Sequence, residues 1–63
     1  MKASKAMLKS IAKIEKKYGK FDKEFGVEPI VENRRGNGYY DYCILTDVIT
    51  DLSFTIAHDG MIF

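Results

Sequence analysis

Chemically versatile residues are scarce in this chain of 63 residues, which has one cysteine, one histidine and no tryptophan. A single cysteine, Cys43, cannot close a disulfide within one chain, so the composition favours a reducing compartment and indicates the cytoplasm. Transition-metal sites usually need about four ligands, which Cys43 and His58 alone cannot supply. We therefore expect neither a disulfide-stabilised secreted domain nor a metal or cofactor site.

Long apolar runs are also missing. No stretch approaches the roughly 18–20 apolar residues that a membrane span requires. The chain starts with charges like those of a signal peptide, but lysines recur at Lys9, Lys13 and Lys16 and interrupt any apolar segment. We therefore expect a complete cytoplasmic protein that does not enter a membrane.

Groups suited to catalysis are equally few. Cys43 and His58 are the residues that would make a nucleophile and its base, but strand alternation places His58 on the face of the core residues. The segment 36–38 joins two expected strands, whereas a phosphate-binding loop would open a helix. A chain this small is also poorly able to enclose a deep pocket. We expect a protein that is not an enzyme.

Charge is distributed unevenly along the chain. Residues 1–20 contain seven lysines and one glutamate, a net charge of +6, whereas residues 21–63 have a net charge of −5. The overall net charge of +1 hides two segments of opposite sign, and such a pattern can indicate a charged partner.

The first segment predicts a helix over about residues 3–18. Its apolar residues recur at the spacing of one helix face, namely Met7, Ile11, Ile14 and Tyr18. The lysines cluster on the opposite side, and Gly19 suits the position just past the helix end. Phe21 and Phe25 follow four residues apart, which fits either one more helical turn or an irregular connector.

From residue 30 onward the apolar residues alternate with a period of two, which predicts strands. The expected strands are residues 30–33, 39–46 and 52–58, with 61–63 as a very short fourth, and turns between them contain Asn, Asp and Gly. Short loops make neighbouring strands antiparallel. The predicted fold is α+β: one N-terminal amphipathic helix packed on a three- or four-stranded antiparallel β-meander, in one domain over residues 1–63 with its sheet over about 30–63.

The predicted sheet is expected to expose aromatic residues, because a single helix covers only one face. Alternation puts either the set containing Cys43 and Leu45 or the set containing Tyr42 and Ile44 on the exposed face. Tyrosine contributes large contact area at low entropic cost, so such a face favours protein binding. The candidate protein-binding residues are Tyr39, Tyr40, Tyr42, Asp41, Asp47 and Asp51.

The lysine side of the helix is a second candidate surface. A basic helix can follow nucleic-acid phosphates, while tyrosines stack on bases. The candidate residues for nucleic-acid binding are Lys2, Lys5, Lys9, Lys13, Lys16, Lys20, Arg34 and Arg35. The acidic second segment argues against this function, since it would repel the same phosphates.

Together these patterns predict a small non-enzymatic regulator or inhibitor that binds another protein. A compact, lysine-rich chain of this length suits a phage or mobile-element accessory protein, including an inhibitor of a nucleic-acid-processing complex. Two alternatives remain open: a nucleic-acid-binding module that uses the lysine side of the helix, and a structural homodimer formed through the exposed sheet face or residues 61–63.

Overall fold

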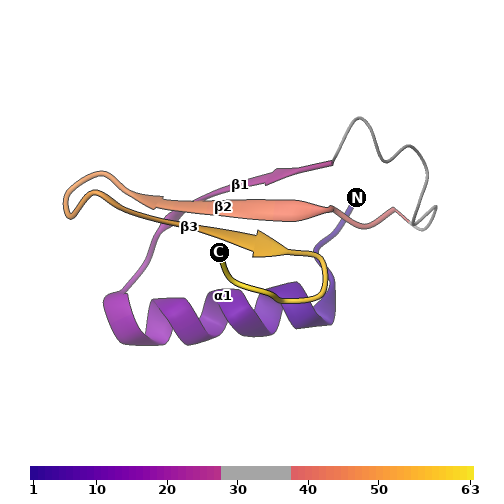
Figure 1. The fold of residues 1–63 in the computed structure, drawn as a ribbon, viewed down its shortest axis with the longest axis horizontal. Coiled ribbons are helices and arrows are strands. Elements are labelled where there is room, and N and C mark those ends of the chain that lie inside the picture. Colours follow the sequence, from indigo (N-terminus) through magenta and orange to yellow (C-terminus); the bar gives the residue numbers. More distant parts are fainter. Residues whose placement is uncertain (28–37) are drawn as a thin grey trace.

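A single helix lies on one side of a three-stranded antiparallel sheet in the computed structural model, which describes residues 1–27 and 38–63 (Figure 1). The elements are α1 (Lys5–Tyr18), β1 (Asp22–Gly26), β2 (Tyr42–Asp47) and β3 (Leu52–Ala57), and the strand order is β1-β2-β3. The predicted α+β fold, a helix packed on an antiparallel meander, is confirmed.

Both ends of α1 have the caps that the sequence provides. The Ser4 hydroxyl accepts a hydrogen bond from the Met7 N–H at 3.1 Å, which satisfies one of the free amides of the first turn. The same hydroxyl donates to the His58 carbonyl at 2.6 Å and thereby fastens the helix start to the end of β3. At the other end, the Gly19 N–H donates to the Glu15 carbonyl at 2.8 Å.

The turn after β3 packs directly against α1. Gly60 has a φ of +90°, and a Cβ there would lie 2.8 Å from the Ala6 carbonyl oxygen. The Ser10 hydroxyl donates to the Gly60 carbonyl. Glycine is therefore needed at this position both for its backbone conformation and for the close approach.

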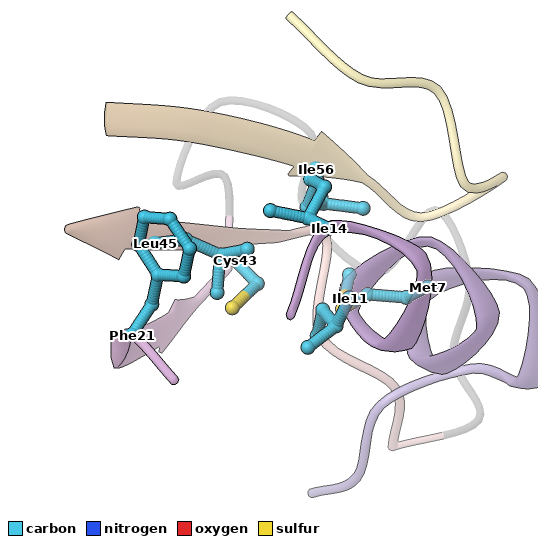
Figure 2. Packing of buried hydrophobic residues seen from close by; sticks show 7 residues of the cluster. All are labelled: Met7, Ile11, Ile14, Phe21, Cys43, Leu45 and Ile56. Atoms are coloured by element: carbon cyan, nitrogen blue, oxygen red, sulfur yellow. The ribbon is translucent and has the colours of Figure 1, made fainter. Parts of the chain in front are cut away.

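The core lies between α1 and the two strands β2 and β3. Met7, Cys43, Leu45 and Ile56 have no exposed surface. Figure 2 shows how the side chains from α1 meet those from the strands; the seven buried residues of the cluster are Met7, Ile11, Ile14, Phe21, Cys43, Leu45 and Ile56. Of the two sets of β2 residues that alternation left open, Cys43 and Leu45 face the helix.

The segment after the helix is a strand. The sequence analysis predicted either one more helical turn or an irregular connector for Phe21 and Phe25, and both alternatives were wrong. β1 pairs antiparallel with β2, with Phe25 opposite Cys43, so the sheet begins at Asp22 rather than near residue 30. The physical reason is that residues four apart share a face in a strand as well as in a helix. Pairing with β2 makes this segment a strand. Phe21 is buried, and the Phe25 ring stacks on Tyr40 with ring centroids 5.1 Å apart.

Three further expectations need correction. Tyr18 is 46% exposed, although its ring packs against Phe54 with centroids 5.7 Å apart. The strand expected from Tyr39 begins at Tyr42, because the backbone of residues 38–40 bonds instead to Lys2. Residues 61–63 pair antiparallel with β3 through the Ile62–Ile56 bridge and backbone bonds at Met61 and Phe63, but they do not form a fourth strand of the sheet. The strand expected at 30–33 and most of the turn at 34–38 lie outside the described residues.

Cys43 offers a test of the core. Because burial raises the pKa of its thiol, and no surface of the residue is exposed, we expect native protein to react very slowly with a thiol reagent. The measurement is the labelling rate with and without denaturant, with Ser53→Cys in a Cys43→Ala background as the exposed control. Equal native rates for the two thiols would contradict the packing described.

Glu15 joins α1 to β1. Its carboxylate accepts hydrogen bonds from the Lys23 ammonium at 2.7 Å and from the Phe21 N–H at 3.0 Å. These two contacts, the lysine first, hold the pKa of Glu15 below its ordinary value of 4.5. A carboxyl group with a lowered pKa in the folded state stabilises the fold above its unfolded pKa, and this contribution is lost as the pH falls through the folded pKa.

We therefore expect Glu15→Gln to lower the free energy of unfolding at neutral pH by about 1 kcal/mol, a value reduced by solvent screening of the partly exposed pair. The deficit relative to wild type should shrink as the pH falls below 4.5. Denaturant titrations at several pH values measure both effects. Glu24→Gln, at an exposed carboxylate on β1, is the matched control and should change stability by less than about 0.5 kcal/mol.

Candidate functional site

The sheet face that points away from α1 carries a mixed apolar and acidic surface, which we call the open face. The pairing register sets its membership, since residues directly opposite each other share a face. One row across the strands consists of Glu24, Ile44 and Thr55, and the next of Gly26, Tyr42 and Ala57. The third row consists of Asp22, Thr46 and Ser53.

Tyr42 lies across the β1 side of the open face. A Cβ added at Gly26 would overlap the end of the Tyr42 ring, so the ring rests directly over the glycine backbone. Any larger residue at this position would force the ring to move. The missing side chain of Gly26 therefore makes room for the Tyr42 ring, which is half-buried.

Phe63 extends the open face beyond β3. Its N–H donates to the Thr55 carbonyl at 2.8 Å, and its carbonyl accepts from the Thr55 N–H at 3.2 Å. Two residues that exchange both backbone bonds have side chains on the same side of the sheet, so Phe63 lies beside Thr55 in the row of Ile44. The Phe63 side chain is 71% exposed. A large aromatic ring is thus presented to solvent next to Thr55, in the row that contains Ile44.

The opposite edge of the open face is acidic. Asp22 and Glu24 are exposed on β1, and the three strands place no basic side chain on this face. Lys23, the one basic residue within the strands, alternates to the helix side and bonds to Glu15. The open face therefore combines Tyr42, Ile44 and Phe63 with a negative edge that no basic side chain of the three described strands compensates.

The structure separates the three tyrosines that the sequence analysis grouped. Tyr42 lies on the open face, whereas Tyr40 stacks on Phe25, which shares the helix side with Cys43. Tyr39 lies under the Lys2 ammonium, 5.0 Å from the ring centroid, and meets His58 edge-on at 5.9 Å. They do not form one tyrosine surface, and of the three only Tyr42 belongs to the open face.

The candidate carboxylates are also spread apart. The Asp41 N–H donates to the Gly26 carbonyl at the end of β1. Asp47 accepts the Ile49 N–H at 3.0 Å and so shapes the β2–β3 turn. Asp51 closes that turn with a φ of +60°, a conformation that Asp tolerates better than most residues. Asp47 and Asp51 thus have structural roles in one turn, away from Tyr42.

The β2–β3 turn contains the most exposed apolar pair of the described residues. Val48 is 78% exposed and Ile49 is 90% exposed. The sequence analysis assigned these two residues no role. It placed Phe63 in a very short strand and, as one alternative, in a dimer contact through residues 61–63. Apolar residues at turn and terminal positions were the available signal in both cases.

The structure brings together four of the lysines that were predicted to bind nucleic acid. Lys5, Lys9, Lys13 and Lys16 are exposed on α1, opposite the buried side of the helix. Lys5 and Lys9 border a shallow apolar depression with Leu8 and Ala12. Lys2 packs on Tyr39, and Lys20 lies past the helix end. Arg34 and Arg35 lie outside the described residues.

The groups considered for catalysis do not form a reactive arrangement. Cys43 is buried in the core with a raised pKa, which favours the unreactive thiol. The Nε2 of His58 is shielded from solvent and has no hydrogen-bond partner among the residues that the structure describes. Within residues 1–27 and 38–63, no three His, Cys, Asp or Glu side chains gather to hold a metal ion.

None of the helical segments in the described part of the chain is both long and apolar enough to pass through a bilayer.

Comparison with known proteins gives no match to any family model, curated protein or solved structure. The function is therefore inferred from the surfaces of this chain alone.

Gly26→Ala tests the position of Tyr42. We expect the added methyl group to displace the ring, with little change in stability because the obstructing atoms are at the end of a flexible side chain. Alanine loses less conformational freedom on folding than glycine does, and this should offset part of the cost of displacing the ring. The net change in the free energy of unfolding should be less than about 1 kcal/mol. NMR shifts of the Tyr42 ring protons measure the displacement. Tyr40, on the other side of the sheet, is the internal control, and equal shifts of both rings would contradict the arrangement.

Proposed function

We propose that this protein is a non-enzymatic regulator or inhibitor that binds another protein through the open face. The observation that supports this function most directly is the exposed Phe63 ring beside the Ile44 row, on a sheet face that α1 does not cover. Aromatic residues on an exposed sheet contribute large contact area and are enriched at interfaces. Tyr42 adds a second aromatic residue to the same face.

Charge specifies the kind of partner. A surface that covers the open face would also approach Asp22 and Glu24, whose carboxylates lose hydration when they are covered. A partner surface with an apolar centre and lysine or arginine at one side compensates both features. This chemistry is compatible with the basic groove of a nucleic-acid-processing protein, the class of target predicted from the sequence.

A second copy of the chain suits this face less well. In a symmetric dimer the same patch is used by both copies. Each copy would then bring Asp22 and Glu24 to the interface without a basic side chain from the strands to pair with them. Pairing the open face of one copy with the lysines of another would be a head-to-tail contact, which forms a ring or an open-ended chain rather than a two-fold dimer.

The test uses the full chain in two steps: affinity capture from the native host with mass spectrometry, then binding measurements with the purified partner. Phe63→Ser and Glu24→Lys should each weaken binding about tenfold or more, as expected for a central aromatic contact and a reversed charge. The matched controls are Ile49→Ser, which removes an even more exposed apolar residue, and Asp59→Lys, which reverses an exposed carboxylate in another turn.

Three outcomes would contradict the proposal. Binding that depends on Ile49 but not on Phe63 would place the interface at the β2–β3 turn. Equal effects of the variants and their controls would show that the open face is not specific. A stable dimer of the wild type in light scattering, lost in Phe63→Ser, would assign the open face to self-association.

A further inference from the structure

The outer side of α1 carries four exposed lysines, Lys5, Lys9, Lys13 and Lys16, which we call the lysine row. The row is opposite the buried residues Met7 and Ile11, and consecutive members Lys5, Lys9 and Lys13 are four residues apart. Residues at this spacing are neighbours on the helix surface, so the row is a compact strip of positive charge.

Carboxylates do not compensate the row. The first turn of α1 contains no acidic residue, and Glu15, the one acid of the helix, is engaged by Lys23 and the Phe21 N–H. Within the described residues, none of the four lysines forms an ion pair. Like charges four residues apart lower helix stability, whereas alternating Glu and Lys would raise it. Helix stability therefore does not account for the row, and an external anion would relieve its repulsion.

The main objection to an anionic partner is that the acidic second segment of the sequence would repel it. The fold places carboxylates of this segment on the side of the sheet away from α1. Asp22 and Glu24 lie on the open face, on the side of the sheet away from α1, so they do not face what α1 binds. Asp59 is the acidic residue in the turn that contacts α1 at Ala6 and Ser10. The two carboxylates of β1, Asp22 and Glu24, are thus separated in space from the row.

The length of the row suits a regular polyanion. At about 1.5 Å per residue, Lys5 and Lys16 are about 16 Å apart along the helix axis. A nucleic-acid duplex presents about one phosphate charge per 1.7 Å, so about ten phosphates occur over this length. The side chains between the lysines, Leu8 and Ala12, have no hydrogen-bonding groups. Such a surface contacts a charged backbone and does not distinguish base sequences.

We propose that the lysine row binds the phosphate backbone of a nucleic-acid duplex without sequence preference. A membrane surface fits less well, because the apolar side of α1 that would enter the lipid is buried in the core. An acidic protein fits less well, because the row has no aromatic residue or arginine of the kind that anchors protein interfaces. This site lies on the opposite layer from the open face and does not depend on the protein-binding function.

The test is fluorescence anisotropy of a labelled DNA duplex, and of an RNA duplex of the same sequence, titrated with the full chain over a range of salt concentrations. With three to four phosphate contacts, the slope of log K against log salt should be about −3 for DNA. Several unrelated sequences should bind equally, and the two duplexes identify which nucleic acid is preferred.

Matched variants identify the row as the site. Lys9→Gln with Lys16→Gln should flatten the slope by about 2 and weaken binding at every sequence. Lys9→Arg with Lys16→Arg should retain binding, because both charges remain. Lys17→Gln with Lys20→Gln removes the same charge from exposed positions off the row and should leave the slope nearly unchanged. Circular dichroism confirms that each variant is folded.

Three results would overturn the inference. Wild-type protein that does not bind either duplex at low salt excludes the site. Equal losses in the row variant and the off-row variant mean that net charge, rather than the row, attracts the duplex. Tighter binding to polyglutamate or to vesicles of anionic lipid than to either duplex, at the same salt concentration, assigns the row to a different partner.

Discussion

The packing of one helix against β2 and β3 is the interaction on which the rest of the structure depends. Met7, Ile11 and Ile14 reach the core formed by Cys43, Leu45 and Ile56, and Ser4 and Ser10 fasten the helix to the end of β3. A helix covers one face of a sheet. Because no second helix exists in the described residues, the same packing that buries Cys43 and Leu45 leaves Tyr42 and Ile44 partly exposed on the other side.

This two-layer arrangement sorts charge by face. The helix layer presents lysines outward, and the sheet layer presents Asp22 and Glu24 outward, so these two groups of opposite charge lie on opposite layers of one small molecule. The ion pair of Lys23 with Glu15 lies between the layers and links α1 to β1. We proposed above that the open face binds a protein and that the lysine row binds a polyanion, and these two sites lie on opposite layers of the fold.

Much of the fold follows from local pattern, and the errors share one cause. The spacing of Phe21 and Phe25 is compatible with a helix and with a strand, and only pairing with β2, distant in sequence, makes it a strand. Alternation through Tyr39 and Tyr40 suggested a continuous strand, but their backbone bonds to Lys2 at the start of the chain. The candidate tyrosine surface therefore reduces to Tyr42. Local periodicity contains no information about such long-range partners.

The sequence by itself determined the amphipathic helix that ends at Gly19, the alternation of Leu52–Ala57, and the lysines opposite the apolar side of α1. Only the tertiary structure decided which face of β2 is covered, that β1 exists, and that Phe63 joins Ile44 and Tyr42 on one surface. The physical reason is that periodicity states which residues share a face. Which face loses contact with water depends on where α1 packs, and that is decided by contacts between residues far apart in the chain.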